Sequence, residues 1–530
     1  MFEIQAQQDE KQGHWLGAVA AWRGYARTSP EDGAWKKAMG HLHDVCGLSW
    51  TRPIKAYEVL PLVVGKDVVA VPYRVKYSDG LRNVVSAIDP TSGVLLWTRE
   101  DAVVFPYQGD LVVFVQNWEH VVRVDAKTGS DMWAHPFPSP DGGRVSGSAN
   151  LPGDDLRGEG PRHVLGLHGD SVIVQGDTWP FSLDLASGKV RWGASADARR
   201  GYRARLTTAG VVAWPGQTRP SGMSDADWQA SPMVMLSYDD GHVVWKRATI
   251  AGEPWYVVSG AQRLYVSDPN LQTEIAWTAL SLEKGTTAWR QAQAEARPSV
   301  LTPTDKVLVV QSPEGLDHHL TRFLDPASGK VLWQSEHVIK VTQQGFVLVL
   351  APGEALQARD IANGKTLWTL APTEGLDIDP NGALVDGNVY LAAHAPGALS
   401  GTDTPAMAGV DGKSGQVMWA QRSADTPYPQ DYHALAVAGD VLLLEQTMAI
   451  SHAKLANRAP IQVSSLLALD AGKGDVAWGF YNLAGASGSP PVRIGDTLYV
   501  VGLERDAYCV CSFDLAHIRD LVKQGRRWWW

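Results

Sequence analysis

The sequence repeats one short pattern nine times. The pattern has an apolar residue, then Asp, then Gly four residues later, then Trp after four more. Seven copies keep all three residues: Asp89, Gly93, Trp97; Asp125, Gly129, Trp133; Asp184, Gly188, Trp192; Asp325, Gly329, Trp333; Asp360, Gly364, Trp368; Asp411, Gly415, Trp419; and Asp470, Gly474, Trp478. Two copies have Ser at the Asp position: Ser237, Gly241, Trp245 and Ser281, Gly285, Trp289. Such a chain must fold as a series of like units, because one short unit cannot bury its apolar face alone.

The length of the repeat indicates the kind of unit. Successive Trp residues from Trp97 to Trp478 are on average about 48 residues apart, a spacing typical of four-stranded propeller blades. Short β-rich runs separated by turns precede each motif, as in AVVFPYQG, LVVFVQN and HVVRVDA. We therefore predict an all-β fold, a single large β-propeller of four-stranded blades.

Each residue of the motif has a structural reason to recur. The Asp carboxylate can cap backbone N–H groups of a turn, and Gly can adopt the positive φ that the turn needs. The Trp ring can pack between neighbouring blades. Stacking on a sugar or a quinone is the functional alternative. A residue present in every unit serves the repeat itself, so we interpret these Trp residues as packing residues.

The two ends of the chain predict how the ring closes. Three strands end at Asp514 with no Gly and Trp after them, whereas CGLSWTRP around Trp50 resembles VLLWTRE of the first full unit. We predict that residues 47–53 complete a composite blade with residues 488–514, which gives ten blades. The alternative is eight blades with two units folded as insertions. In this register Cys46 lies opposite Asp514, roughly 10 Å along the strand from Cys511, which disfavours a disulfide without excluding it.

The terminal segments differ from the repeats. Residues 1–46 contain two amphipathic segments, and the spacing of Ala18, Trp22, Tyr25 and Pro30 resembles a tetratricopeptide repeat. We predict three regions: a helical hairpin (1–46), the propeller (47–514), and a short helix with a Trp-rich tail (515–530). The final residues could bind a partner or fold back onto the protein: Trp528, Trp529 and Trp530.

Composition excludes several classes of protein. The net charge is -10 and no basic run is longer than Arg526–Arg527, which argues against nucleic-acid binding. No stretch of 18 apolar residues is present, so we expect no transmembrane segment. The start has no signal-peptide pattern, and Cys46, Cys509 and Cys511 are too few for a disulfide framework. We expect a cytoplasmic protein, or a periplasmic or extracellular one if a leader is missing from the chain.

The common catalytic and metal-binding motifs are absent from the sequence. It contains no His-Glu-x-x-His, Gly-x-Ser-x-Gly, phosphate loop or Cys-x-x-Cys. His318–His319 and His41 with His43 do not share a face of their elements, and residues 139–160 lack the carboxylate spacing of a calcium loop. We therefore predict no catalytic residue, no cofactor and no metal ligand.

The repeats resemble those of the PQQ-like propeller superfamily (quinoprotein and BamB type) over residues 47–514. Its enzymes bind quinone and calcium beneath a vicinal cysteine pair, but here Val510 separates Cys509 from Cys511. The resemblance therefore implies a non-catalytic scaffold with protein partners, without a small-molecule ligand. One alternative is a quinone- and calcium-dependent oxidoreductase. The other is a carbohydrate-binding propeller that uses Trp residues outside the motif: Trp118, Trp179, Trp214, Trp228 and Trp255.

Overall fold

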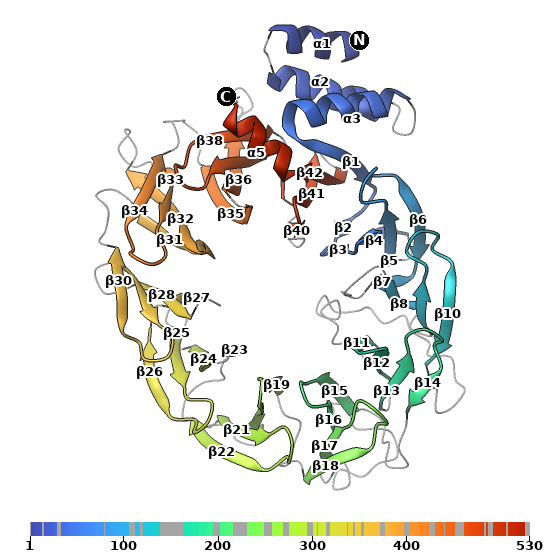
Figure 1. Ribbon diagram of the computed structural model, residues 1–530, viewed down its shortest axis with the longest axis vertical. Coiled ribbons are helices and arrows are strands. Elements are labelled where there is room, and N and C mark those ends of the chain that lie inside the picture. The colour runs from blue at the N-terminus through green and yellow to red at the C-terminus, as the bar shows by residue number, and fades with distance from the viewer. Residues whose placement is uncertain are drawn as a thin grey trace.

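The computed structural model describes residues 2–12, 15–28, 33–78, 80–104, 112–116, 120–137, 163–176, 179–193, 202–215, 231–248, 257–268, 275–293, 300–304, 306–313, 319–336, 338–342, 345–350, 355–370, 377–396, 403–422, 430–438, 440–450, 461–481, 484–485, 491–504 and 507–524. Antiparallel sheets stand around a ring (Figure 1). Their main strands follow chain order from the centre outwards, except that β1 is the outermost strand of the last sheet. The predicted all-β propeller with four-stranded blades is confirmed.

The first half of the ring starts with an enlarged sheet: β2 (Glu58–Val59), β3 (Val63–Val64), β4 (Val69–Tyr77), β5 (Gly80–Ile88) and β6 (Leu95–Glu100). Four four-stranded sheets follow: β7 (Ala102–Val104), β8 (Val112–Gln116), β9 (His120–Val124), β10 (Asp131–Pro136); β11 (His163–His168), β12 (Ser171–Gln175), β13 (Pro180–Asp184), β14 (Val190–Trp192); β15 (Tyr202–Leu206), β16 (Val211–Pro215), β17 (Pro232–Leu236), β18 (Val243–Ala248); and β19 (Val257–Ser259), β20 (Arg263–Asp268), β21 (Ile275–Ser281), β22 (Thr287–Gln293).

The second half contains four more four-stranded sheets: β23 (Val300–Pro303), β24 (Leu308–Pro313), β25 (His319–Leu324), β26 (Val331–Ser335); β27 (Val338–Val341), β28 (Phe346–Leu350), β29 (Leu356–Asp360), β30 (Thr366–Leu370); β31 (Asp377–Asp386), β32 (Asn388–Pro396), β33 (Asp403–Val410), β34 (Val417–Arg422); and β35 (Gln430–Ala438), β36 (Val441–Ile450), β37 (Ile461–Asp470), β38 (Val476–Tyr481). The last sheet combines both ends of the chain: β39 (Ala484–Gly485), β40 (Val492–Ile494), β41 (Thr497–Glu504), β42 (Ala507–Asp514) and β1 (Leu48–Ile54).

The described strands thus form ten sheets, of which eight have four strands. The other two depart from the predicted four, because a short hairpin adds β3 to β4 in one and β40 to β41 in the other. The two shortest motif intervals, Trp97 to Trp133 and Trp333 to Trp368, each hold a full sheet, β7–β10 and β27–β30.

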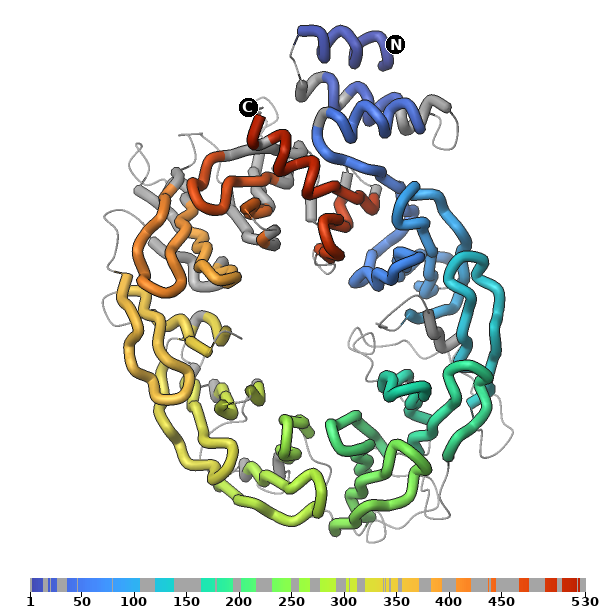
Figure 2. Tube along the Cα trace, viewed as in Figure 1, coloured from blue at the N-terminus to red at the C-terminus, as the bar shows by residue number. Residues whose placement is uncertain are grey.

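Strand β1 joins the last sheet as its outermost strand. It pairs antiparallel with β42, with Thr51 opposite Cys511, as the sequence predicted for the strand around Trp50. Figure 2 shows the blue start of the chain beside its red end. All three cysteines are free, and the disulfide that the register disfavoured is not formed.

Three helices precede β1 and lie outside the ring: α1 (Phe2–Gln12), α2 (Trp15–Thr28) and α3 (Gly33–Cys46) (Figure 1). The predicted two-helix hairpin was therefore incomplete. The sequence of α1 is mostly polar, with several Gln, Glu and Lys residues that favour a helix but give no apolar periodicity. Polar contacts hold α1 in place: Glu10 accepts a hydrogen bond from the Trp22 indole at 2.6 Å and lies 3.1 Å from His41 Nδ1.

The predicted C-terminal helix is α5 (Leu515–Lys523), which begins directly after β42. Its residues Leu515 and Ile518 are buried in the same apolar cluster as residues of α3, β1 and β42. Leu521 is buried as well, outside that cluster. Elsewhere the core is divided into clusters between neighbouring sheets, as where Val309 and Phe323 pack against Val347. Among the described helices, none is long and apolar enough to cross a membrane.

Candidate functional site

A β-bulge precedes the motif Trp in every one of the ten sheets. The pairing register between the third and fourth strands skips one residue there, as between Ile88, opposite Leu95, and Ala87, opposite Trp97. The skipped residues are Ser49, Leu96, Met132, Arg191, Val244, Ala288, Leu332, Leu367, Met418 and Ala477. A bulge changes the direction of the side chain that follows it, and in this position that side chain is the Trp.

The indole of the motif Trp is hydrogen-bonded to the next sheet. In nine described cases the indole nitrogen donates, at 2.8–3.0 Å, to the backbone carbonyl directly after the next motif Asp or Ser. The Trp residues are Trp50, Trp97, Trp133, Trp192, Trp245, Trp289, Trp333, Trp368 and Trp419. These rings connect neighbouring sheets, which supports the packing interpretation over stacking on a ligand.

The motif Gly lies directly against the same ring. The nine motif glycines have φ between +65° and +74°, a region that favours Gly. A Cβ atom there would lie 2.4–2.7 Å from the Trp ring of the preceding sheet. Both the turn and the close approach of the ring therefore require Gly at this position.

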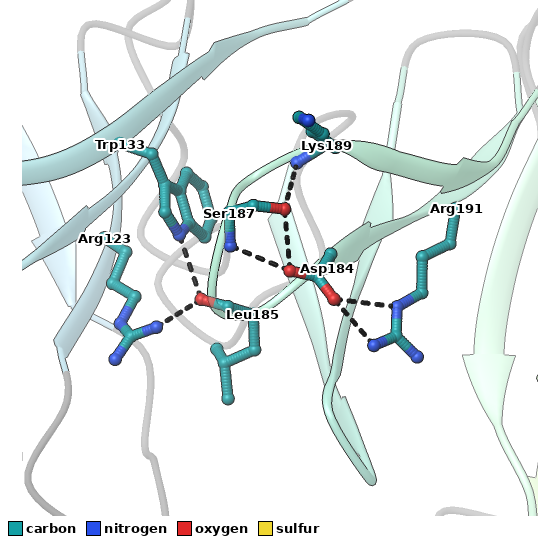
Figure 3. A network of polar contacts seen from close by, with 7 residues as sticks. All are labelled: Arg123, Trp133, Asp184, Leu185, Ser187, Lys189 and Arg191. Atoms are coloured by element: carbon teal, nitrogen blue, oxygen red, sulfur yellow. Dashed lines mark hydrogen bonds and ion pairs between the residues drawn. The ribbon is translucent and has the colours of Figure 1, made fainter.

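The motif Asp stabilises its own turn, as Figure 3 shows for Asp184. Its carboxylate accepts hydrogen bonds from the backbone N–H and the hydroxyl of Ser187, at 2.8 and 2.7 Å, and from Arg191 at 2.6 Å. These bonds, led by that from Arg191, hold the pKa of Asp184 well below its ordinary value. Trp133 and Arg123 of the preceding sheet both donate to the carbonyl of Leu185.

The composite sheet replaces this turn with two helices. Asp514 donates its backbone N–H to the Gly47 carbonyl at 2.8 Å, the same pairing that joins Asp89 to Val94 in the first unit. No turn links these two strand ends: β42 continues into α5, and α3 leads into β1. Both helices contact β38. The helices thus occupy the place that a motif turn has in the other sheets.

Several predicted site residues have other roles or lie outside the described residues. A carbohydrate-binding propeller would need the Trp residues outside the motif to be exposed, but Trp179 and Trp214 are buried, so this interpretation is wrong for both. Their neighbours Tyr202 and Met235 belong to the same apolar clusters. The other proposed residues lie outside the described part of the chain: Trp118, Trp228, Trp255, Trp528, Trp529 and Trp530. The side chain of Trp478 and the segment 139–160 lie outside it too.

Three histidines make ring contacts in the helices at the two ends of the chain. His41 stacks on Trp22 with ring centroids 4.1 Å apart, and His43 stacks on His517 at 4.6 Å. His318 lies outside the described residues. No group of three or more metal-ligating side chains was found within the described ranges.

The outermost strands carry a surface that the sequence interpretation missed. Nine large apolar side chains between the motif Gly and Trp are 37–53% exposed, spread over seven sheets. We call them the rim residues: Val94, Leu95, Met132, Val190, Val244, Val331, Leu332, Leu367 and Val417. The bulge causes part of this exposure, since Met132, Val244, Leu332 and Leu367 are skipped residues. Their apolar character was visible in the sequence, but alternation alone does not reveal a bulge.

The rim residues lie on strands that end their sheets, except Val94, which directly precedes β6. Strands β6, β10, β14, β18, β26, β30 and β34 are the last in their sheet order and lie on the outside of the ring (Figure 1). An edge strand can pair with an extended segment of another protein, and exposed apolar side chains add contact area. Binding of a polypeptide is therefore the chemistry that this surface supports.

Comparison with known proteins agrees with the architecture. Residues 34–218, 231–340 and 317–460 match the family described as outer membrane protein assembly factor BamB. The chain belongs to this family. The PQQ-like resemblance of the repeats is thereby confirmed. A search of curated proteins finds no match to the sequence.

Two solved structures illustrate the distant similarity of this BamB-family chain to others. BamB from Moraxella catarrhalis is 13% identical, with a TM-score of 0.30, over 88% of this chain and 100% of that chain. Quinohemoprotein alcohol dehydrogenase from Comamonas testosteroni is 14% identical, with a TM-score of 0.36, over 90% of this chain and 77% of that chain. These values assign no functional residue.

Proposed function

We propose that this protein is a non-catalytic scaffold that binds protein partners along the outer strands of its sheets. The observation that carries the proposal is the repeated exposure of the rim residues on edge strands. Apolar side chains exposed singly are common on protein surfaces, but these recur at one place of the repeat around the ring. Family membership supports the proposal, since the family is described as an assembly factor.

We place the binding site on β26 and β30, the outer strands of two successive sheets. Val331 and Leu332 of β26 and Leu367 of β30 are 41–53% exposed. The connection between the sheets is close, because the Trp333 indole on β26 donates to the Ile361 carbonyl, after β29, at 2.9 Å. A partner that pairs with one edge strand would contact the apolar side chains of the next.

We further propose that the ten sheets act as ten blades of one closed ring. The pairing of β1 with β42 and the packing of Trp50 on Gly93 support this arrangement, because they join the last sheet to the first. A closed ring has no end that can open, so it can hold several partners in fixed relative positions. The helical cap, α1–α3, would add a second attachment site outside the ring.

The experiment compares partner capture by charged rim variants with capture by a matched control. The double variant Leu332→Lys, Leu367→Lys should capture much less of the partner than the unchanged protein does. Ile494→Lys is the control, because Ile494 is 46% exposed but lies on β40, an inner strand. Equal capture by the rim variant and the control would contradict the proposed site.

A second measurement separates the scaffold from a quinone-dependent oxidoreductase. PQQ and Ca²⁺ are added to the purified protein, and absorbance, melting temperature and alcohol oxidation are recorded. The scaffold proposal predicts no quinone absorbance in the protein fraction and no oxidation. Dye reduction that depends on both additions would favour the enzyme instead.

A further inference from the structure

We propose that helices α2 and α3 form a binding site for an acidic helix of a partner protein, and that α1 occupies this site in the free protein. The inference rests on the proposed scaffold function, in which the helical cap is a second attachment site. It does not depend on the rim residues, because the cap lies outside the ring (Figure 1).

Helix α1 packs on the other two helices through one face. Residues three and four apart share a face of a helix, and Phe2, Ala6 and Glu10 follow this spacing. The Phe2 ring lies over Gly24 of α2, so close that a Cβ atom on Gly24 would be 2.8 Å from it. Ala6, one turn further along, is fully buried. The surface beneath α1 is therefore shaped for a helix with an aromatic residue and a small residue at these positions.

Two carboxylates of α1 bind polar groups of the cap. Glu10 accepts a hydrogen bond from the Trp22 indole at 2.6 Å and lies 3.1 Å from His41 Nδ1. Glu3 forms an ion pair with Lys37 of α3, and the hydrogen bond from Lys37 lowers the pKa of Glu3. The two carboxylates are seven residues apart, which is about two helical turns, so both lie on the docking side. The site therefore selects a helix with acidic side chains at these two positions.

One buried residue of α1 does not suit the site. Asp9 is only 8% exposed, and within the described part of the chain its carboxylate accepts a hydrogen bond from Gln5 of the same helix alone, at 2.9 Å. A buried carboxylate without a cation loses hydration that nothing replaces. An apolar side chain at this position would therefore dock better than the natural one.

The other contacts of α1 make it replaceable. An exposed ion pair such as that of Glu3 with Lys37 contributes little to stability, and an isolated helix of 11 residues is marginal in water. Ala6 is the one buried apolar side chain of α1. The covalent link to α2 compensates, because it keeps α1 at a high effective concentration near the site. A partner helix with the two carboxylates, and with an apolar residue in place of Asp9, can therefore displace α1.

The first test adds fluorescent peptides to the full-length protein and measures their anisotropy. A peptide of residues 2–12 that carries Asp9→Leu should bind about tenfold more tightly than a peptide of the unchanged sequence. A peptide that carries both Asp9→Leu and Glu10→Lys is the matched control, and it should bind about tenfold more weakly than the Asp9→Leu peptide. Absence of binding by the Asp9→Leu peptide, or equal binding of the control, would overturn the proposal.

The second test locates the bound peptide. Amides of residues 3–12 of the protein should exchange hydrogen about tenfold faster when the Asp9→Leu peptide is bound, because α1 then leaves its site, whereas amides of β24 and β25 should not change. Lys37→Glu should weaken binding of this peptide about tenfold, and a peptide that also carries Glu3→Lys should restore it. Binding without faster exchange in α1 would place the peptide elsewhere and contradict the proposal.

A third measurement separates this site from the rim. The double variant Leu332→Lys, Leu367→Lys should bind the Asp9→Leu peptide as tightly as the unchanged protein does, because β26 and β30 belong to the ring and not to the cap (Figure 1). Loss of peptide binding in this variant would show that the peptide binds the rim, against the proposal. If the variant instead kept its partner capture, the rim site would be wrong and the peptide result would stand.

Discussion

At the residue scale, the repeat depends on one contact between a ring and a backbone. The motif Trp fills the space left by the missing Cβ of Gly and donates to the carbonyl beside it. The sequence predicted the three residue types and their packing role from recurrence alone. It did not predict the bulge, because a bulge depends on the pairing register, and no residue type marks it in Leu96, Arg191 and Ala288 alike.

The glycine requirement can be separated into two parts in one sheet. Gly415 and Gly387 have φ of +72° and +73°, but a Cβ on Gly415 would lie 2.7 Å from the Trp368 ring, whereas Gly387 faces open space. Gly387→Ala should lower the free energy of unfolding by about 1 kcal/mol. Gly415→Ala should lower it by at least about 2 kcal/mol, because steric overlap adds to the strain. Urea unfolding tests this, and equal losses would contradict the role of the ring.

The hydrogen bond of the indole can be tested with two variants of equal volume change. Trp245→Phe removes the donor to the Leu282 carbonyl, whereas after Trp133→Phe the Leu185 carbonyl still accepts from Arg123. Trp245→Phe should therefore lose about 1–2 kcal/mol more free energy of unfolding than Trp133→Phe. The same loss in both variants would mean that ring packing alone joins the sheets.

The capped turn predicts a pH dependence. The pKa of Asp184 is lower in the folded protein than its ordinary value of 3.8, so folding favours the ionised form. Its stabilisation is complete above that value and is lost as the pH falls below it. Asp184→Asn should therefore be less stable than the unchanged protein at pH 7, and the difference should shrink in acid and in high salt. Urea midpoints at several pH values test this, and a constant difference would contradict it.

At the scale of elements, local signals predicted the strands well and the first helix poorly. Each motif lies at a fixed place in its sheet, so the spacing of nine motifs located most strands. Helix α1 gave no such signal, because Glu10 and its other contacts are polar and only Ala6 is a buried apolar residue. The rim residues were also missed, since the sequence of an outer strand does not reveal which of its side chains the neighbouring sheets bury and which remain exposed.

Helix α5 should stabilise the composite sheet through its apolar face. Ile518 is fully buried and its side chain contacts the position of Gly47, at the start of β1. Ile518→Ala should reduce the free energy of unfolding by roughly 2–5 kcal/mol. Arg519→Ala, which removes an exposed ion pair with Asp496, should reduce it by less than about 1 kcal/mol. Similar losses for the two variants in thermal or urea unfolding would contradict the packing role of α5.

At the scale of the molecule, the composite sheet is the prediction that needed both ends of the sequence. The similarity of the residues around Trp50 to the first repeat identified β1 as the missing outer strand, because strict recurrence allows a displaced copy to be recognised. The burial of side chains from the preceding helices, including Trp22 and Arg23 of α2, could not be inferred, since these residues are not part of the repeat.

Removal of β1 should affect the whole protein. A chain lacking residues 1–54 loses the buried Trp50 and leaves β42 as an open edge. We expect a loss of unfolding free energy greater than the roughly 3–5 kcal/mol of one buried Trp, together with self-association. A chain lacking only residues 1–12 is the control. Light scattering and thermal unfolding test this, and a peptide of residues 47–54 should partly restore the monomer.

The meeting of both chain ends in one sheet also constrains how the protein is made. During synthesis β1 leaves the ribosome long before its partner β42. Until β42 has been made, β1 lacks its partner strand, and its apolar side needs other cover, such as the helices α1–α3 that precede it. A chain that ends before β42 would therefore contain the strands of every earlier sheet but could not complete the sheet that β1 joins.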